Sequence, residues 1–504
     1  MAPTLGTSFC CSPGITEMIP KLLKALFLGV VLIAVVVVIK TMLFVPPTLE
    51  PRQAVSYVID EQSIVRHMSE AITFQTISHG DDSNTPREPF EDFITWLAET
   101  YPLVHSQLSN ERIAQYSLLY KWPGSDTGSK PILLTAHYDV VPVPQSSADQ
   151  WQHQPFAGEI EDGVVWGRGA LDDKSAVIAL MEAVTLLLES GQEPRQDVYI
   201  AIGHDEEVGG YEGAAAIVST LKQRGIQFEW SLDEGSFVLD GIIPGLDVPL
   251  AGINLAEKGF LTIEIIARSE GGHSSMPPHD MAIYMLTEVL NDLHETPFAL
   301  HMDSGPSIEM YLAIARYMPF KKRMVFANRW LFGPLLESAL TKNPIAAAML
   351  HTTIAPTMLN AGIKANVLAP EARATVNLRI HPQDDVDEVV TSLKRTIERD
   401  GVTIDILNKA PASPISRAGS AGFARLANVA RMTFGDVIVA PGLTIAGTDS
   451  KHYGEVSDDS YRFNPMVIDS ADLATFHGVN ERISIDNLVK ATSFYAALIM
   501  EAGH

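Results

Sequence analysis

Acidic and histidine side chains that could bind metal ions or move protons gather in four short segments of this chain, TAHYDV, GRGALDDK, GHDEEVGG and SLDEG. The candidates are His137, Asp139, Asp172, Glu206, Glu207 and Asp233. Imidazole nitrogen and carboxylate oxygen are ligands that zinc accepts in proteins. Two such cations, about 3.5–4 Å apart, need a carboxylate between them to offset their repulsion. These residue types therefore predict a hydrolase that uses two metal ions.

The segments that must position these side chains are predicted strands. Residues 132–135, 198–202 and 228–232 are apolar and β-rich, and each run precedes one of the acidic clusters. Residues 176–188 have a helical pattern that closes with Gly191. Alternating strands and helices predict an α/β domain with a mostly parallel sheet, and such sheets bind ligands at the carboxyl ends of their strands. We therefore expect the clusters to converge on one edge of the sheet.

Eight motifs resemble, in order and spacing, those of the di-zinc exopeptidases and deacylases that include aminoacylase and carboxypeptidase S. They are AHYDVVPVP, WGRGALDDKSAV, GHDEEVGG, LDEG, GGHSSMPP, KANVLAPEARATVNLRIHP, GTDS and FHGVNERIS. The resemblance extends from about residue 60 to residue 500. It implies a zinc-exopeptidase catalytic domain with an inserted α/β lid of the dimerisation type. It also implies reversible hydrolysis of the amide bond of N-acyl amino acids, with N-fatty-acyl amino acids as the expected substrates.

The same resemblance implies two zinc ions per chain. His137, Asp172 and Asp233 would hold one ion, and Asp172, Glu207 and His477 would hold the other. Asp172 would then bridge the two ions. A single histidine or aspartate in a polar loop is usually a solvated residue or a helix cap. The whole ligand set in the family's order argues against that simpler interpretation.

Two further residues of these segments are expected to support catalysis. Asp139 is placed to accept the second N–H of His137 and so fix its tautomer. Glu206 is adjacent to the ligand Glu207, and neighbouring side chains at a strand end point in different directions. We therefore assign Glu206 as the general base and acid. The alternative for Glu206 is a second structural carboxylate.

Five residues later in the chain are expected to contact substrate, by the same resemblance. His273 would donate to the developing oxyanion, and in dimerising relatives the equivalent histidine reaches the neighbouring subunit's site. Its alternative is an ordinary histidine in a turn. Asn366 and Arg379 would hold a substrate carboxylate, although a salt bridge is the alternative for Arg379. Gly447 and Thr448 would line the pocket through backbone donors.

The motifs and the composition together predict five parts of the chain. Residues 1–24 are a cytoplasmic amino terminus, 25–45 a transmembrane anchor, and 46–258 the first part of the catalytic domain. Residues 259–381 are the lid domain and 382–504 are the second catalytic part. The lid limits come from GFLTIEIIARS and ATVNLRIHP, which are predicted strands that bracket a helical, apolar interior.

The apolar segment is long enough to cross a bilayer and ends before Pro46 and Pro47. Lys21 and Lys24 precede it, which predicts a cytoplasmic amino terminus and an extracytoplasmic catalytic domain. A cleaved signal peptide is the alternative.

The cysteines and the charge bear on compartment and partners. Both cysteines, Cys10 and Cys11, precede the apolar segment, so the exported part is expected to have no disulfide, which suits a bacterial periplasmic location. The formal net charge of −25 disfavours nucleic acid as a partner. We expect a single-pass membrane protein, a possible homodimer, that acts on a small N-acyl amino acid or a short peptide.

Other functions remain open at this point. A carboxypeptidase S-like exopeptidase would cleave a chemically equivalent bond, and the ligand motifs cannot separate it from a deacylase. A catalytically silent, membrane-tethered binding protein is a third possibility, although every expected ligand and Glu206 are present. Residues 307–349 form an apolar, helix-leaning insert, which could be lid core or could face a lipid-like acyl chain.

Overall fold

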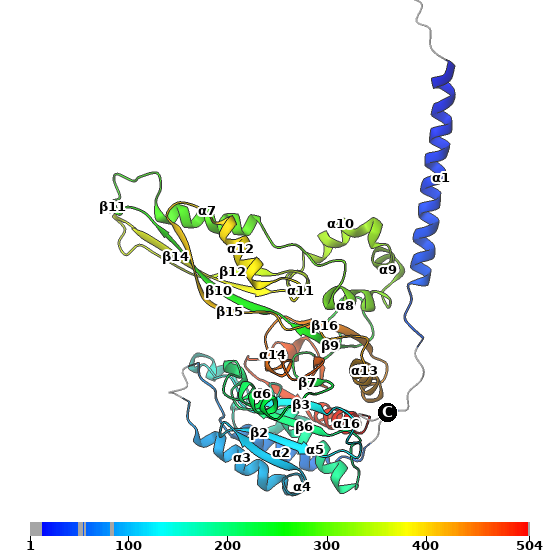
Figure 1. The fold of residues 1–504 in the computed structure, drawn as a ribbon, viewed down its shortest axis with the longest axis vertical. Helices are drawn as coiled ribbons and strands as arrows, with labels where there is room; N and C mark the ends of the chain where they lie inside the picture. The colour runs from blue at the N-terminus through cyan, green and yellow to red at the C-terminus, as the bar shows by residue number, and fades with distance from the viewer. Residues whose placement is uncertain (1–12, 49–53, 55–56, 81–84, 502–504) are drawn as a thin grey trace, which may run out of the picture. The chain divides into compact units, whose positions relative to one another are not determined.

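The computed structural model describes residues 13–48, 54, 57–80 and 85–501. These residues form two compact units. One consists of Met1–Leu49 and Ala315–Leu340, and the other of Glu50–Ile314 and Thr341–His504. The chain can be followed by colour in Figure 1.

The larger unit contains a sheet with the order β1-β2-β6-β3-β7-β17-β9-β8-β18, and β16 pairs with β9. Its strands are β1 (Ser109–Ile113), β2 (Ser117–Trp122), β3 (Ile132–His137), β6 (Val198–Gly203), β7 (Ser231–Asp233), β8 (Val238–Leu239), β9 (Leu250–Glu257), β16 (Ile438–Thr444), β17 (Ser460–Arg462) and β18 (Val467–Ile468). The central strands β6, β3, β7 and β17 are parallel to one another.

The sheet is mixed: its central strands are parallel, as expected, but several other neighbouring strands are antiparallel. β1 and β2 are antiparallel, as are β2 and β6, β8 and β9, and β17 and β9. The physical reason is connection length, because a short turn such as that between β1 and β2 can join only antiparallel neighbours. The parallel part is restricted to the centre and to the pairs of β16 with β9 and β18 with β8.

The predicted strands that carry the clusters are present. β3 and β6 match the expected runs, whereas β7 begins only at Ser231, since Phe228 forms an isolated bridge with Ser457. The helix expected after GRGALDD is α5 (Lys174–Glu189).

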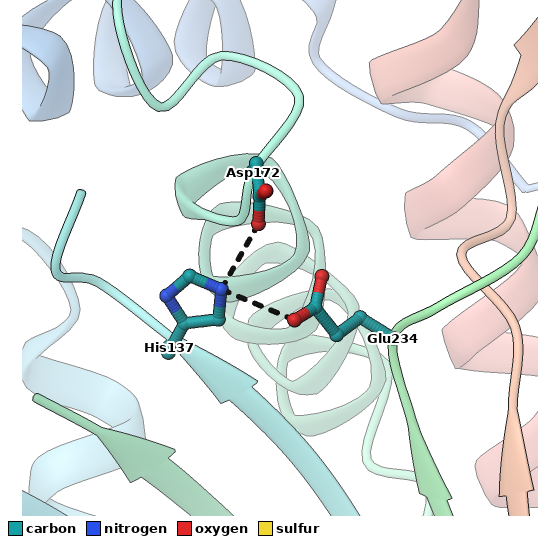
Figure 2. A group of neighbouring side chains, drawn as sticks. All are labelled: His137, Asp172 and Glu234. Carbon is teal, nitrogen blue, oxygen red and sulfur yellow. Dashed lines mark hydrogen bonds and ion pairs between the residues drawn. The ribbon is translucent and has the colours of Figure 1, made fainter. Parts of the chain in front are cut away.

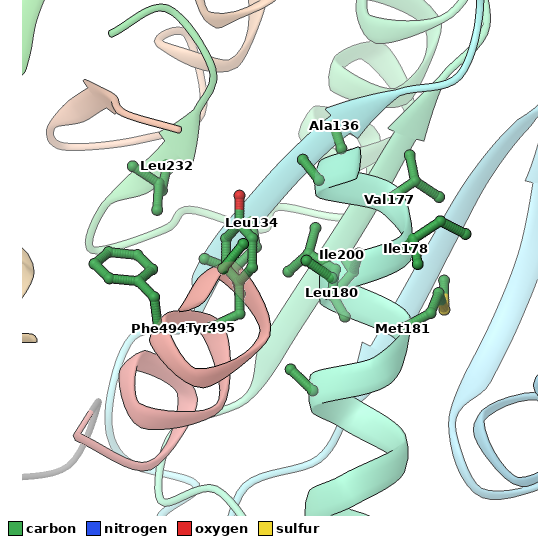
Figure 3. Close-up of a cluster of buried hydrophobic side chains, with 14 of the residues drawn as sticks. Leu134, Ala136, Val177, Ile178, Leu180, Met181, Ile200, Leu232, Phe494 and Tyr495 are labelled. Carbon is green, nitrogen blue, oxygen red and sulfur yellow. The ribbon is translucent and has the colours of Figure 1, made fainter. Parts of the chain in front are cut away.

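Helices cover both faces of this sheet, so the central strands are apolar on both sides. Leu134 and Ile200 pack with Leu180 of α5 and Phe494 of α16 (Ile485–Glu501), as Figure 3 shows. On the opposite face, strand residues such as Leu133 pack against α6 (Ala214–Gln223). The carboxyl edge of the sheet is therefore held on a rigid, close-packed layer.

A second sheet in this unit has the order β12-β14-β10-β15. Its strands are β10 (Gly259–Arg268), β12 (Thr353–Ala361), β14 (Glu371–Ile380) and β15 (Val402–Ala410). The helices α7 (Ala282–Glu295) and α12 (Val386–Thr396) pack on its apolar face. β15 pairs along β10, so this sheet continues past His381, where we had expected the lid to end.

The larger unit also contains further helices and strands outside these two sheets. They are α2 (Glu61–Thr73), α3 (Glu88–Thr100), α4 (Pro102–Gln107), β4 (Ile160–Glu161), β5 (Val164–Trp166), β11 (Gly272–His273), α8 (Pro306–Ala315, whose last residue falls in the smaller unit), α11 (Pro344–Leu350), β13 (Val367–Leu368), α13 (Ala421–Phe434), α14 (Ser450–Tyr453), α15 (Ser470–Leu473) and β19 (Arg482–Ser484).

The smaller unit combines α1 (Pro13–Leu43) with α9 (Phe320–Ala327) and α10 (Arg329–Leu340). Within α1, Pro20–Leu43 contains an 18-residue window with a mean hydropathy of 3.1 and is long and apolar enough to cross a membrane. Among the described residues it is the one helix with these properties. The helix ends before Pro46 and Pro47, where the sequence predicted its end.

The core supports a direct stability test. Leu180→Ala should lower the free energy of unfolding by about 2–5 kcal/mol, because it leaves a cavity at a fully buried position. Leu473→Ala, at a position where 43% of the residue is exposed, serves as the control and should change little. Denaturant titration of both variants measures the difference, and equal effects would contradict the packing described above.

Candidate metal centre

Three potential ligands from different elements meet at the carboxyl edge of the large sheet. His137 ends β3, Asp172 lies in the loop before α5, and Glu234 follows β7, as Figure 2 shows. The Nε2 atom of His137 is 3.0 Å from Asp172 Oδ1 and 3.4 Å from Glu234 Oε1. One ligand atom from each of the three residues lies within 4.8 Å of the others, which is close enough for one metal ion.

A second group shares Asp172 with the first. His477 Nε2 is 3.0 Å from Asp172 Oδ2 and 3.3 Å from Glu207 Oε2. These three residues also have ligand atoms within 4.8 Å of one another. Asp172 thus offers one carboxylate oxygen to each group, an arrangement that suits a bridging ligand.

Asp139 connects the first histidine to the two glutamates. His137 Nδ1 lies 3.2 Å from Asp139 Oδ1 and 3.1 Å from its carbonyl oxygen. The same carboxylate accepts hydrogen bonds from the backbone N–H groups of Glu206 and Glu207, each at 3.2 Å. Asp139 therefore orients the imidazole and also holds the turn that carries both glutamates.

The structure brings Glu234, and not Asp233, into the first group. Asp233 is buried, and its Oδ1 accepts a hydrogen bond of 2.6 Å from Thr135 Oγ1. β7 ends at Asp233, and the following side chain points in another direction because orientation alternates along a strand. The SLDEG motif offers two adjacent acids, so the sequence could have identified Glu234 only with the strand register known.

Glu206 lies close to the first group without being part of it. Its Oε2 is 4.0 Å from His137 Nε2, and only 11% of its side chain is exposed. Burial, with the charge of Glu234 as the next cause, raises the pKa of Glu206 well above its ordinary value. A carboxyl group with a raised pKa holds a proton more readily than an ordinary glutamate, which is a property of general acids and bases.

Crowded carboxylates dominate the electrostatics of the centre. Burial and then Asp172 raise the pKa of Glu207, and the same two causes raise that of Glu234 to about 8. Hydrogen bonds to Asp172 and Glu207 raise the pKa of His477 to about 10. For His137, burial favours the neutral ring, but Glu234, Asp139 and Asp172 outweigh it and raise its pKa.

These shifts describe a buried cluster with more negative charge than its two imidazoles can offset. In addition, Glu207 Oε1 is buried and has no hydrogen-bond partner among the described residues. A divalent cation at each group would satisfy both conditions, and the nitrogen and oxygen donors fit zinc. The residues present therefore fit the metal that the sequence predicts.

The loop that carries Asp172 is held by Glu481, which our sequence reasoning did not single out. Glu481 is buried, and its Oε1 accepts hydrogen bonds from the backbone N–H groups of Gly169 (3.0 Å) and Leu171 (2.9 Å). Arg168 forms an ion pair with the same carboxylate. The motif FHGVNERIS contains Glu481 four residues after His477, and this spacing was the available signal.

The candidate substrate residues His273, Asn366 and Arg379 lie outside both ligand groups, on β14 and in or beside a separate two-stranded sheet of β11 and β13. His273 is exposed, and its Nδ1 is 2.8 Å from Ser275 Oγ. It pairs with Val367 between β11 and β13, and Ser274 N–H donates to the carbonyl of Asn366, so His273 and Asn366 are neighbours. Arg379 is exposed on β14, opposite Phe260 of β10.

Gly447 and Thr448 have different surroundings. Gly447 is exposed, whereas Thr448 is buried and donates from both its backbone N–H (3.2 Å) and its hydroxyl (2.8 Å) to Glu257 Oε2. The backbone donor of Thr448 is thus used inside the protein and is not presented to a ligand.

The fold is α/β with a mixed sheet, and two groups of potential metal ligands share one aspartate at the edge of that sheet. This combination is typical of metallohydrolases. The chain belongs to peptidase family M20/M25/M40, whose family model matches residues 133–501. This result confirms the resemblance on which the sequence interpretation rests. Members of this family are metal-dependent enzymes that typically bind zinc.

Two relatives are similar over most of their length. N-fatty-acyl-amino acid synthase/hydrolase PM20D1 of Mus musculus is 39% identical over 438 residues, which cover 86% of each chain. Probable carboxypeptidase S-like 2 of Dictyostelium discoideum is also 39% identical, over 446 residues that cover 88% of this chain and 85% of the relative.

Solved structures support the fold. Human carnosine dipeptidase 1 matches with a TM-score of 0.60 at 15% identity, covering 88% of this chain and 96% of that one. An M20 family metallo-carboxypeptidase from Sulfolobus solfataricus matches with a TM-score of 0.61 at 18% identity, covering 87% of this chain and 99% of that one.

Measurement of the zinc content of two variants can show whether Asp233 or Glu234 binds metal. Glu234→Ala should bind less zinc than the unchanged protein, because it removes a potential ligand atom from the first group. Asp233→Asn should keep its zinc, because Asn can still accept from Thr135. Zinc content by elemental analysis measures the difference, and loss of metal from Asp233→Asn alone would restore Asp233 as the ligand.

Proposed function

We propose that this chain is a di-zinc amidohydrolase that cleaves, and in reverse forms, the amide bond of N-fatty-acyl amino acids. The observation that carries this proposal is Asp172, whose two oxygens serve two ligand groups beside the poised carboxyl of Glu206. The similarity to N-fatty-acyl-amino acid synthase/hydrolase PM20D1 supports the substrate class.

One zinc would be held by His137, Asp172 and Glu234, and the other by Asp172, Glu207 and His477; Glu234 here replaces the expected Asp233. When bound, zinc polarises a carbonyl and makes water more acidic. Asp139 keeps the Nδ1 atom of His137 engaged, so that Nε2 is free to act as the ligand.

Glu206 would take a proton from the attacking water and pass it to the leaving nitrogen. The water oxygen bonds to the acyl carbon, the carbon–nitrogen bond breaks, and the products are a fatty acid and an amino acid. Burial suits Glu206 to both steps, since it raises the pKa of this carboxyl and so favours proton uptake from the water.

Arg379 and Asn366 would hold the free carboxylate of the substrate, and His273 would stabilise the oxyanion. In this proposal His273 acts across a homodimer, because it is exposed on β11, in the two-stranded sheet with β13, and outside both ligand groups of its own chain. Exposed Gly447 would border the pocket, whereas Thr448 would support it through Glu257.

The helix α1 would anchor the enzyme in a membrane, with the amino terminus cytoplasmic and the catalytic unit outside, as in a periplasm. Lys21 and Lys24 at its amino end support this orientation. A cleaved signal sequence is the alternative function of this helix.

A second candidate function is a carboxypeptidase S-like exopeptidase. The Dictyostelium relative and the mouse enzyme are each 39% identical to this chain. Cleavage of a peptide bond next to a free carboxylate needs the same chemistry as cleavage of an N-acyl bond. A non-catalytic binding protein is disfavoured, because the described site retains both ligand groups and Glu206.

The proposed role of Glu206 as general base and acid is tested by an isosteric substitution that removes its charge. Glu206→Gln should keep its zinc and lose at least about 10²-fold in kcat, since general acid–base catalysis supplies about 10²–10⁴. Asp172→Ala should instead release metal, because it belongs to both ligand groups. Kinetics with matched zinc analysis distinguishes the two, and near-native turnover by fully loaded Glu206→Gln would refute the assignment.

The substrate class is tested with a panel of N-acyl amino acids of increasing chain length, together with dipeptides. Each buried methylene contributes about 0.8 kcal/mol, so kcat/KM should rise steeply from N-acetyl to long-chain substrates. Equal or better values for N-acetyl substrates or dipeptides would favour the exopeptidase function instead.

The role of His273 is tested by subunit exchange. His273→Ala and Glu206→Gln should each be nearly inactive, and mixing them should restore part of the activity, because a heterodimer contains one intact composite site. Mass spectrometry would verify the exchange. Exchange without recovered activity would mean that His273 acts within its own chain or not at all.

A further inference from the structure

The helices α9 and α10 pack against the carboxyl end of α1. Asn328 lies between α9 and α10 and is fully buried. Its Nδ2 donates to the carbonyl of Val37 at 3.2 Å and to Thr41 Oγ1 at 3.1 Å. Thr41 in turn donates to Val37 O at 2.7 Å. An amide in contact with a membrane-crossing helix is a specific contact, because the polar group would otherwise be unsatisfied in lipid.

Two further contacts lie at the same end of the helix. The guanidinium of Arg316 donates to the carbonyl of Val45 at 3.2 Å and lies 4.8 Å from the centre of the Phe44 ring. Lys40 Nζ lies 5.9 Å from the centre of the Trp330 ring. Residues 315–340, which we call the anchor hairpin, therefore contact α1 along its last turns, from residue 37 onward (yellow-green helices in Figure 1).

The anchor hairpin differs in charge from the rest of the chain. It contains five basic residues and one acidic residue, Glu337, in a chain with a formal net charge of −25. The basic residues are Arg316, Lys321, Lys322, Arg323 and Arg329. Cations concentrated beside a membrane helix are attracted by anionic lipid headgroups.

The hairpin also exposes large apolar side chains. The exposed fractions are 42% for Phe320, 55% for Trp330, 41% for Leu331 and 59% for Leu335. Aromatic and aliphatic side chains next to basic ones are typical of helices that lie in the membrane interface. Tryptophan in particular concentrates at the level of the headgroups.

The contacts with α1 set the depth of the hairpin. Pro20–Leu43 is about 36 Å long at about 1.5 Å per residue, whereas the hydrocarbon core is about 30 Å thick. Val37 is six residues before the end of α1, or about 9 Å along the axis. A hairpin attached between Val37 and Val45 would therefore lie at the boundary between acyl chains and headgroups.

We propose that the anchor hairpin is an interfacial membrane element, seated in the leaflet next to the carboxyl end of α1. Its exposed apolar side chains enter the acyl region, and its cations bind anionic headgroups. The enzyme would thus be held at the bilayer by two elements. This inference rests on the proposed membrane anchor and is independent of the proposed reaction.

The test places fluorescent probes on the full-length chain in vesicles. In a Cys10→Ser/Cys11→Ser background, single cysteines replace Leu335 in the hairpin, Leu32 in α1, or Ile160 on β4. Leu335 and Ile160 are similarly exposed, at 59% and 51%. The vesicles contain phosphatidylcholine with phosphatidylglycerol, and a nitroxide on the lipid acyl chain quenches probes that enter the bilayer.

The proposal expects most of the fluorescence at positions 32 and 335 to be lost, with little loss at position 160. If the probe at position 32 is quenched but the probe at 335 is quenched no more than the probe at 160, the proposed role of the hairpin is wrong, whereas the proposed membrane anchor α1 is supported. No quenching at 32 would overturn both. Disulfide dimers through position 335, or protection from labelling by an N-fatty-acyl amino acid without lipid, would assign the surface to a second copy or to substrate.

The charge is tested by comparing vesicles with and without phosphatidylglycerol. Quenching at 335 should be stronger with the anionic lipid, and Lys321→Glu/Lys322→Glu/Arg323→Glu should abolish that difference. Lys394→Glu/Arg395→Glu on α12 is the matched control and should retain it. Bromolipid quenching of the native tryptophans, compared with Trp330→Phe, gives a second measurement without labels. Equal quenching in both lipids would overturn the role of the cations.

Discussion

The carboxylate of Asp172 is the constraint on which the rest of the catalytic unit depends. It must present one oxygen to His137 and the other to His477, which are 340 residues apart in sequence. A loop cannot fix such a group alone, so the backbone around Asp172 is tied to Glu481, close behind His477 in the chain. Glu481, which is distant from Asp172 in sequence, thereby positions the loop that carries Asp172.

The same arrangement creates an electrostatic problem that shapes the surrounding residues. Buried carboxylates repel one another, and the imidazoles of the centre can neutralise only part of their charge. Burial, and after it the repulsion between neighbouring carboxylates, raises the pKa values of Glu206, Glu207 and Glu234. Divalent cations would relieve this repulsion at the ligands, whereas Glu206, outside both ligand groups, would keep the affinity for protons that its proposed role needs.

The sequence predicted the features that depend on local pattern. The central strands β3 and β6, α5 and the end of α1 follow from hydrophobic periodicity and helix-ending residues. It could not predict what depends on pairing between distant segments. Whether Glu234 or Asp233 lies beside His137 and Asp172 depends on side-chain direction at the end of β7, and the extent of the second sheet depends on the pairing of β15 with β10.

The anchor hairpin was visible in sequence only as an apolar insert, because a helical stripe packed in a core and one facing lipid have the same pattern. The charge of the anchor hairpin distinguishes these two possibilities. A catalytic chain with a formal net charge of −25 would be repelled by an anionic bilayer, but charges farther away than about 8 Å are screened at physiological ionic strength. Only groups at the surface itself therefore decide the contact. Five cations placed at the end of α1 make that contact attractive, while the acidic remainder of the chain stays soluble.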